Sequence, residues 1–130
     1  MRGLGRVAAA VGLAAALGCG GGGAPVAPTI TGKDLMEDVK RMLAFAAEQK
    51  LKVPTKAAEL DTVEPVAPLA GPAIRDGDIV YAWGAGLTGG GAVVAHEKKA
   101  ETAGGWVLLQ DGTVKEMTAD EFKAAPRAKK

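Results

Sequence analysis

The N-terminal quarter of the chain constrains its folding most, because little in it could enter a core. Arg2 and Arg6 precede an apolar run at 7–17, a pattern typical of a secretory signal. Gly20 to Thr31 is a Gly, Pro and Ala stretch without periodicity, which predicts a flexible tether. Only residues 33–125 are then left to form one small domain.

Cys19 is the only cysteine, and it ends the apolar run in the context Ala16-Leu17-Gly18-Cys19-Gly20. This context predicts a bacterial lipobox, with residues 1–18 removed and Cys19 lipidated. The run of about eleven apolar residues is too short to span a bilayer, which needs about 20. An ordinary signal peptide cut near Ala24 or Ala27, leaving a secreted protein, and an uncleaved anchor stay open as alternatives.

The sequence thus predicts four segments: a signal peptide at 1–18, lipidated Cys19 with its tether at 19–32, a folded domain at 33–125, and a disordered basic tail at 126–130. Without the signal peptide, 14 Lys and Arg face 15 Asp and Glu. This near-neutral balance argues against nucleic acid as a partner, since phosphate binding requires a basic face. The membrane is the expected partner.

The residue types that are missing exclude several kinds of catalysis. The chain has no Ser and no Asn, and it has one His and one Cys. A serine nucleophile, a Cys-His dyad and a His-rich metal cluster therefore cannot be assembled. Carboxylates are available, but none follows a recognisable ligand pattern. We expect no catalytic residue, no cofactor and no metal site, and hence no enzyme.

The fold class predicted is α+β, an amphipathic helix on a small antiparallel sheet of about four strands. The helix is expected from Gly32 to Lys50, with Thr31 as N-cap and Asp34 completing a capping box. Its apolar face recurs at helical spacing. That face is formed by Leu35, Val39, Met42, Leu43 and Ala46.

Four strands follow from branched and aromatic runs, namely 79–83, 92–97, 106–110 and 113–117. Asp111-Gly112 predicts a two-residue type I′ turn between the last two strands. In that register Leu109 faces Val114 and Trp106 faces Met117.

The segments around the sheet carry weaker signals. Residues 55–60 favour one helical turn, whereas three prolines predict an extended surface loop at 64–72. Thr118 to Glu121 is a capping box that opens a short C-terminal helix, and Phe122 is placed to attach that helix to the sheet.

Three features resemble binding sites. Gly84 to Gly89 matches G-x-G-x-x-G, but a strand rather than a helix follows, so we interpret Gly84–Gly91 as a mobile hairpin loop. His96 next to Glu97 is more often structural than catalytic. Asp76, Asp78 and Glu97 could gather to bind calcium, although Asp76-Gly77-Asp78 is more simply a turn. 

The order of elements over residues 34–122 resembles the C-terminal domain of prepilin- or pseudopilin-like proteins abundant in planctomycetes. The most specific part is GGWVLLQDGTVKEMTADEF at 104–122. The resemblance implies a pilin-like helix on a sheet, with Gly104, Gly105, Asp111 and Gly112 setting turns and no catalytic residue to transfer. The family enters the membrane through a long hydrophobic helix, whereas this chain has a lipoprotein signal and a glycine tether.

Two functions are consistent with these observations. The first is a non-enzymatic, lipid-anchored envelope protein that acts through protein contacts, as an accessory to a secretion or pilus-like system. The second is a small ligand- or cation-binding module that uses the Gly84–Gly91 loop and the carboxylates of Asp76 and Asp78. We expect an exported protein that faces the periplasm or the cell surface.

Overall fold

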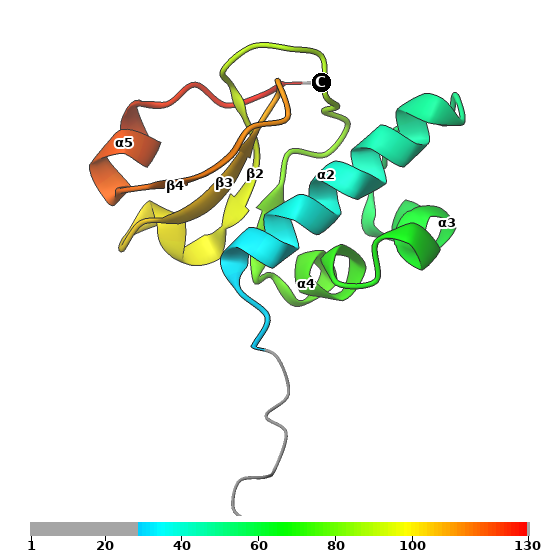
Figure 1. Ribbon diagram of the computed structural model, residues 1–130, viewed down its shortest axis with the longest axis horizontal. Helices are drawn as coiled ribbons and strands as arrows, with labels where there is room; N and C mark the ends of the chain where they lie inside the picture. The colour runs from blue at the N-terminus through cyan, green and yellow to red at the C-terminus, as the bar shows by residue number, and fades with distance from the viewer. Residues whose placement is uncertain (1–28, 130) are drawn as a thin grey trace, which may run out of the picture.

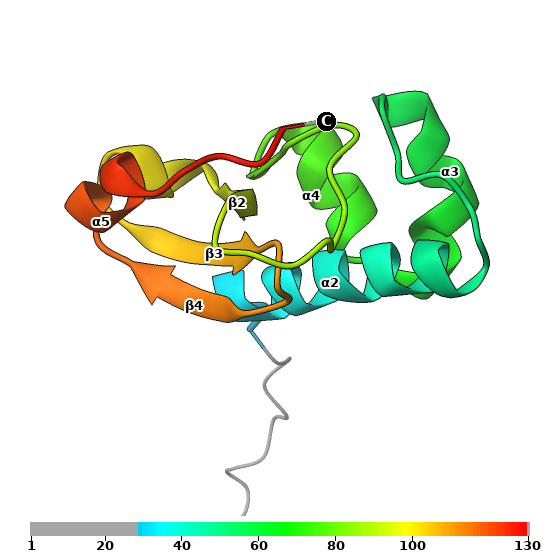
Figure 2. The same cartoon turned by 90° about the horizontal axis from the view of Figure 1, so that it is seen from above.

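The computed structural model describes residues 29–129 and has an α+β fold (Figure 1). Four α-helices and the C-terminal segment of the described residues surround an antiparallel sheet of four strands. In Figure 2, helix α2 (Gly32–Glu48) runs along the lower edge of the molecule and the C-terminal segment passes above the strands. The expected signal peptide, Cys19, most of the expected tether and Lys130 lie outside the described residues.

Helix α2 (Gly32–Glu48) is confirmed together with its cap. The Thr31 side chain accepts the backbone N–H of Asp34, and the Asp34 carboxylate accepts the backbone N–H of Thr31 at 2.8 Å. These hydrogen bonds satisfy N–H groups that the first turn leaves free. The helix ends two residues earlier than expected, because the chain turns at Lys50, whose φ is 55°.

The segment at 64–72 consists of two helical stretches joined by a turn at 67–69, so the prediction of an extended surface loop was wrong. It follows η2 (Ala57–Glu59) and α3 (Leu60–Val63), which confirm the expected helical turn and extend it. It contains η3 (Glu64–Val66) and the start of α4 (Ala70–Asp76). Pro65 and Pro72 lie in first turns, where a missing N–H costs nothing.

A remote side chain caps α4. Buried Asp38 of α2 accepts the backbone N–H groups of Leu69 and Ala70, each at 2.8 Å, and pairs with Arg41. A carboxylate is favourable at this positive helix end. At the other end, Gly77 adopts φ 86° and terminates α4, so Asp76-Gly77-Asp78 is a helix C-cap rather than a simple turn.

The strands β1 (Ile79–Tyr81), β2 (Val93–Glu97), β3 (Gly105–Leu109) and β4 (Val114–Met117) pair antiparallel in that order. Residues 98–101 form η4 (Lys98–Glu101) between β2 and β3. A bulge at Val94 gives β2 one more residue than its partner β3. Val93 and His96 consequently face one side of the sheet, while Val94 and Ala95 enter the core on the other side.

The last hairpin differs from the prediction by one residue. Leu108 pairs with Val114, and Trp106 pairs with Glu116. Gly112 donates its N–H to the carbonyl of Leu109 and has φ 90°, whereas Asp111 keeps a negative φ. This is a type I turn followed by a left-handed glycine, which occupies three residues instead of the two of a type I′ turn. Asp111 still sets the turn, since its carboxylate accepts the N–H of Thr113 at 2.8 Å.

The C-terminal helix α5 (Ala119–Ala124) has the predicted capping box between Thr118 and Glu121. The prediction of a disordered tail from residue 126 was wrong for the part that is described. Val93 donates its N–H to Pro126 and accepts that of Ala128, so the tail adds a bridge to β2. The Arg127 guanidinium lies 3.7 Å from the centroid of the Phe122 ring, which provides a cation–π contact.

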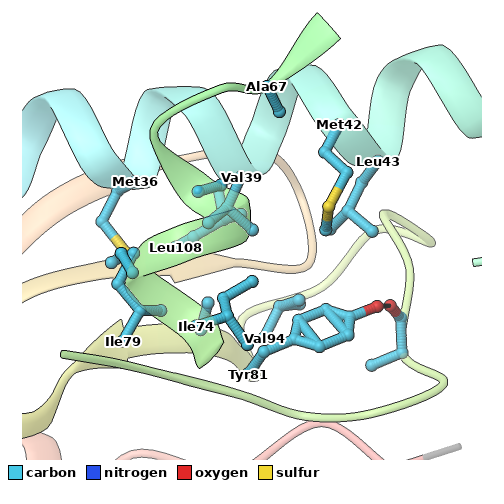
Figure 3. Packing of buried hydrophobic residues seen from close by; sticks show 14 of the residues in the cluster. Met36, Val39, Met42, Leu43, Ala67, Ile74, Ile79, Tyr81, Val94 and Leu108 are labelled. Carbon is cyan, nitrogen blue, oxygen red and sulfur yellow. Dashed lines mark hydrogen bonds between the residues drawn. The ribbon is translucent and has the colours of Figure 1, made fainter. Parts of the chain in front are cut away.

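Two hydrophobic clusters cover the two faces of the sheet. The α2 core fills the space between the sheet and α2, α3 and α4, and Figure 3 shows its centre. The Phe122 cluster lies on the opposite face under α5 and η4. The residues labelled in the α2 core are Met36, Val39, Met42, Leu43, Ala67, Ile74, Ile79, Tyr81, Val94 and Leu108. The Phe122 cluster comprises Val93, Ala100, Val107, Met117 and Phe122.

Candidate functional site

An open cleft of about 590 Å³ lies where the described chain begins. It is bounded by the first turn of α2, the start of β1, the end of β2 and the helical segment η4. Ile30 is 55% exposed at this cleft and is the most exposed large apolar residue in 29–129. The lining residues are Ile30, Gly32, Leu35, Asp78, Glu97, Lys98, Lys99, Glu101 and Thr102.

Glu97 is the central side chain of the cleft. It is the last residue of β2, and only 15% of its side chain is exposed. One carboxylate oxygen accepts the backbone N–H of Trp106 at 2.7 Å. A Cβ at Gly32 would lie 2.3 Å from this carboxylate, and one at Gly105 would lie 2.6 Å from it. The missing side chains of Gly32 and Gly105 therefore leave room for the Glu97 carboxylate between α2 and β3.

The cleft carries charges of both signs. Lys99 brings its Nζ to 4.0 Å from a Glu97 oxygen while 62% of its side chain stays exposed. Lys98 is also exposed, and the carboxylates of Asp78 and Glu101 complete the lining. The basic groups thus lie on the outside of the cleft and the Glu97 carboxylate lies further inside. This arrangement suits a ligand that itself carries both charges.

The alternative calcium site that the sequence left open is not assembled. Asp78 and Glu97 both line the cleft, but Asp76 lies exposed at the end of α4 and does not line it. Within residues 29–129, no three His, Cys, Asp or Glu side chains are close enough to hold a metal ion. The cation version of the binding-module hypothesis therefore gains no support from the geometry.

The Gly84–Gly91 loop connects β1 to β2 and is packed over its first half, contrary to the expectation of a loop with few contacts. Ala85 is buried, and its carbonyl accepts the Tyr81 hydroxyl at 2.5 Å. Burial raises the pKa of that hydroxyl. Gly84 donates its N–H to Pro54, while the exposed tip at 89–91 has glycines with positive φ. The loop forms no phosphate-binding turn, because no helix follows it.

His96 is a buried structural side chain. Its Nδ1 lies 2.8 Å from the carbonyl oxygen of Glu97, so the ring donates a hydrogen bond through Nδ1. The ring packs against Phe122, with 4.4 Å between the centroids. Burial lowers the pKa of His96, and this effect outweighs the hydrogen bond to Glu97 and the nearby charge of Glu101.

Two features escaped the sequence analysis. Asp38 lies three residues after Leu35 and four before Met42, so the helical period places it on the apolar face, and that position signals a buried partner. The contact of Glu97 with Gly32 and Gly105 had no such signal, because Gly32 is distant in the chain and no sequence pattern links either glycine to Glu97. Asp111 and Gly112 were found correctly as turn residues, and Cys19 lies outside the described part.

In the part of the chain that the structure describes, no helix is long and apolar enough to cross a membrane. No protein-family model matches the chain, and neither the curated proteins nor the solved structures contain a match.

Proposed function

We propose that this protein is a non-enzymatic, lipid-anchored protein of the bacterial envelope whose small domain acts through protein contacts. The observation that carries the proposal is the context of Cys19, a lone cysteine after a basic and then an apolar segment. The described residues begin at Thr29, and nine residues, 20–28, separate Thr29 from Cys19, so the proposed anchor would hold the domain close to the membrane.

The arrangement of the domain supports a pilin-like role as an accessory to a secretion or pilus-like system. α2 packs across the antiparallel sheet and contacts β2, β3 and β4, as the resemblance to pseudopilin-like domains implies. The scarcity of nucleophilic side chains in the sequence favours a role in protein contacts over a role in catalysis. His96, the one histidine, is occupied in packing against Phe122.

The anchor is tested by mass spectrometry of the protein purified from membranes. We expect a mature chain that begins at Cys19 and carries lipid, and we expect Cys19→Ala to accumulate as a precursor that keeps residues 1–18. A mature chain with an unmodified Cys19 thiol, or one that begins near Ala24, would exclude the lipid anchor.

The protein-contact role is tested by in-cell cross-linking of the tagged protein, with Cys19→Ala as the control that lacks the anchor. Enrichment of pseudopilins or secretion components over this control is the expected result. Recovery of only the protein itself and bulk envelope proteins in both samples would contradict the accessory role.

A further inference from the structure

We propose that the cleft at the start of α2 docks on the membrane that holds the anchor, and that it receives the headgroup of an aminophospholipid. The inference rests on the proposed anchor at Cys19 and identifies what the anchored domain contacts next. Three observations carry it: the reach of the linker, the chemistry of the cleft, and the exposed Ile30 at its edge.

The linker places the cleft nearest the bilayer. Nine residues, 20–28, separate Cys19 from the described domain. Nine residues span at most about 35 Å when fully extended. A domain of this size has a radius of gyration of about 13 Å, so its far side reaches the membrane only with the linker nearly extended. The face around Ile30 and Gly32 reaches it without stretching.

The tether also makes weak contacts effective. A surface held by a short linker experiences its target at an effective concentration in the millimolar range. A headgroup that binds the cleft too weakly for detection in free solution is therefore bound for much of the time once the domain is anchored.

The charges of the cleft match a zwitterionic headgroup that can donate hydrogen bonds. Lys98 and Lys99 on the outside suit a phosphate, and the carboxylate of Glu97 further inside suits an ammonium. In an ethanolamine headgroup the phosphate lies closer to the hydrocarbon than the ammonium does, which is the same order. The carboxylates of Asp78 and Glu101 would repel a headgroup that is only anionic. A choline headgroup has no N–H and therefore cannot donate a hydrogen bond to the carboxylates of the cleft.

Ile30 supplies the apolar contact. Its 55% exposure at the margin of the cleft places a branched aliphatic side chain beside the lysines, an arrangement typical of surfaces that lie on a membrane. The opposite end of α2 provides a matched comparison, because Leu51 is 42% exposed there and Lys52 and Lys56 are nearby in the chain. The 17 residues of α2 separate these two ends by about 25 Å.

The test uses the mature chain from Cys19, coupled through its single thiol to a maleimide lipid in vesicles. This synthetic anchor allows docking to be measured whether or not cells lipidate Cys19, so the two proposals fail separately. Hydrogen–deuterium exchange is compared on vesicles of phosphatidylcholine alone and of phosphatidylcholine mixed equally with phosphatidylethanolamine. The first-turn amides at 30–33 and the segment 98–103 report on the cleft.

We expect exchange in both segments to slow by about fivefold or more on the vesicles with phosphatidylethanolamine. Ile30→Asp and the double variant Lys98→Glu/Lys99→Glu should abolish this protection. The matched controls Leu51→Asp and Lys52→Glu/Lys56→Glu should retain it, and thermal melts in solution verify that each variant is folded. Equal exchange on both kinds of vesicle, or equal loss in test and control variants, would overturn the proposal. Protection that requires an anionic lipid instead would also overturn it.

Discussion

The two faces of the sheet are covered by elements of different kinds. One face packs against α2, α3 and α4 through the α2 core, to which every strand except β4 contributes fully buried residues. The other face is covered by α5, η4 and the C-terminal segment, and its cluster has one large aromatic residue, Phe122. The first face therefore has many aliphatic contacts, whereas the second has a smaller cluster in which Phe122 is the only buried residue of α5.

This difference predicts unequal stability. A core of many interlocking residues opens only when the whole domain unfolds, whereas an element attached through one side chain can open locally. Phe122 contacts His96 at 4.4 Å and Arg127 at 3.7 Å, so helix, strand and tail meet at this single residue. We expect α5 and residues 126–129 to open before the α2 face does.

The largest effect is expected from Leu108→Ala in the α2 core. Leu108 is fully buried beneath α2, and its truncation should lower the free energy of unfolding by about 4 kcal/mol. Chemical denaturation followed by circular dichroism measures this loss. Because the α2 core unfolds as a unit, exchange should accelerate in every element together. Acceleration confined to β3 would contradict a single cooperative core.

Phe122→Ala should cost somewhat less, about 3 kcal/mol, because its site at the edge of the domain can collapse. The physical consequence differs from that of Leu108→Ala. Exchange should accelerate in α5, η4 and residues 126–129, while α2 keeps its protection. If α2 and α5 lose protection together, the two faces are one cooperative unit and the comparison fails.

Gly104→Ala tests how tightly β3 and α5 are joined. A Cβ here would lie 2.7 Å from the carbonyl oxygen of Met117, and the residue has φ 81°. We expect a loss of about 2 kcal/mol from strain and contact together. Gly112→Ala is the matched control, since Gly112 has φ 90° but its nearest contact would be the flexible Lys40 side chain at 3.5 Å. Strain alone should cost it about 1 kcal/mol. Equal losses would show that the Met117 contact is unimportant.

Thr118→Ala removes the cap of α5 and should cost about 1 kcal/mol. The same substitution at Thr31 removes the cap of α2, so the pair compares the two faces directly. Thermal melts should show similar losses of global stability. Local exchange should rise in α5 alone for Thr118→Ala, because α2 is also held by its buried face. Fraying of α2 in Thr31→Ala to the same degree would contradict this.

The smallest effect concerns pH. The pKa of His96 is lowered by burial below its ordinary value of 6.5, so the unfolded chain binds more protons than the folded one below that pH. Stability should be fully present above about pH 6.5 and should fall as pH decreases toward the lowered pKa. Melting temperatures in His96→Gln should lose this slope between about pH 7 and pH 5. A slope that persists in the variant would assign it to other groups.

Local interactions account for what the sequence predicted. Both capping boxes, Thr31 with Asp34 and Thr118 with Glu121, join residues three apart, and the apolar period of α2 is visible within five turns. The strands were recognised from their branched residues. The position of Asp111-Gly112 was also predicted, but the choice between a two- and a three-residue loop depends on strand register, which the dipeptide alone does not determine.

Long-range contacts account for what the sequence could not show. Asp38 caps α4 from 31 residues away and makes a helix where the prolines predicted a loop. Arg127 and its neighbours are held by Val93 and Phe122, although their composition resembles a solvated tail. Glu97 is held at the base of the cleft because Gly32 and Gly105 leave space for its carboxylate.

The sequence by itself predicted α2, α5, the four strands and their order, because each depends on residues within a few positions of one another. The anchor at Cys19 stays a prediction of the same local kind. The tertiary structure alone decided which side chains converge at the cleft, how α4 begins and where the C-terminal segment lies. These features form from groups distant in the chain, whose meeting is set by the packing of α2 and α5 on opposite faces of the sheet.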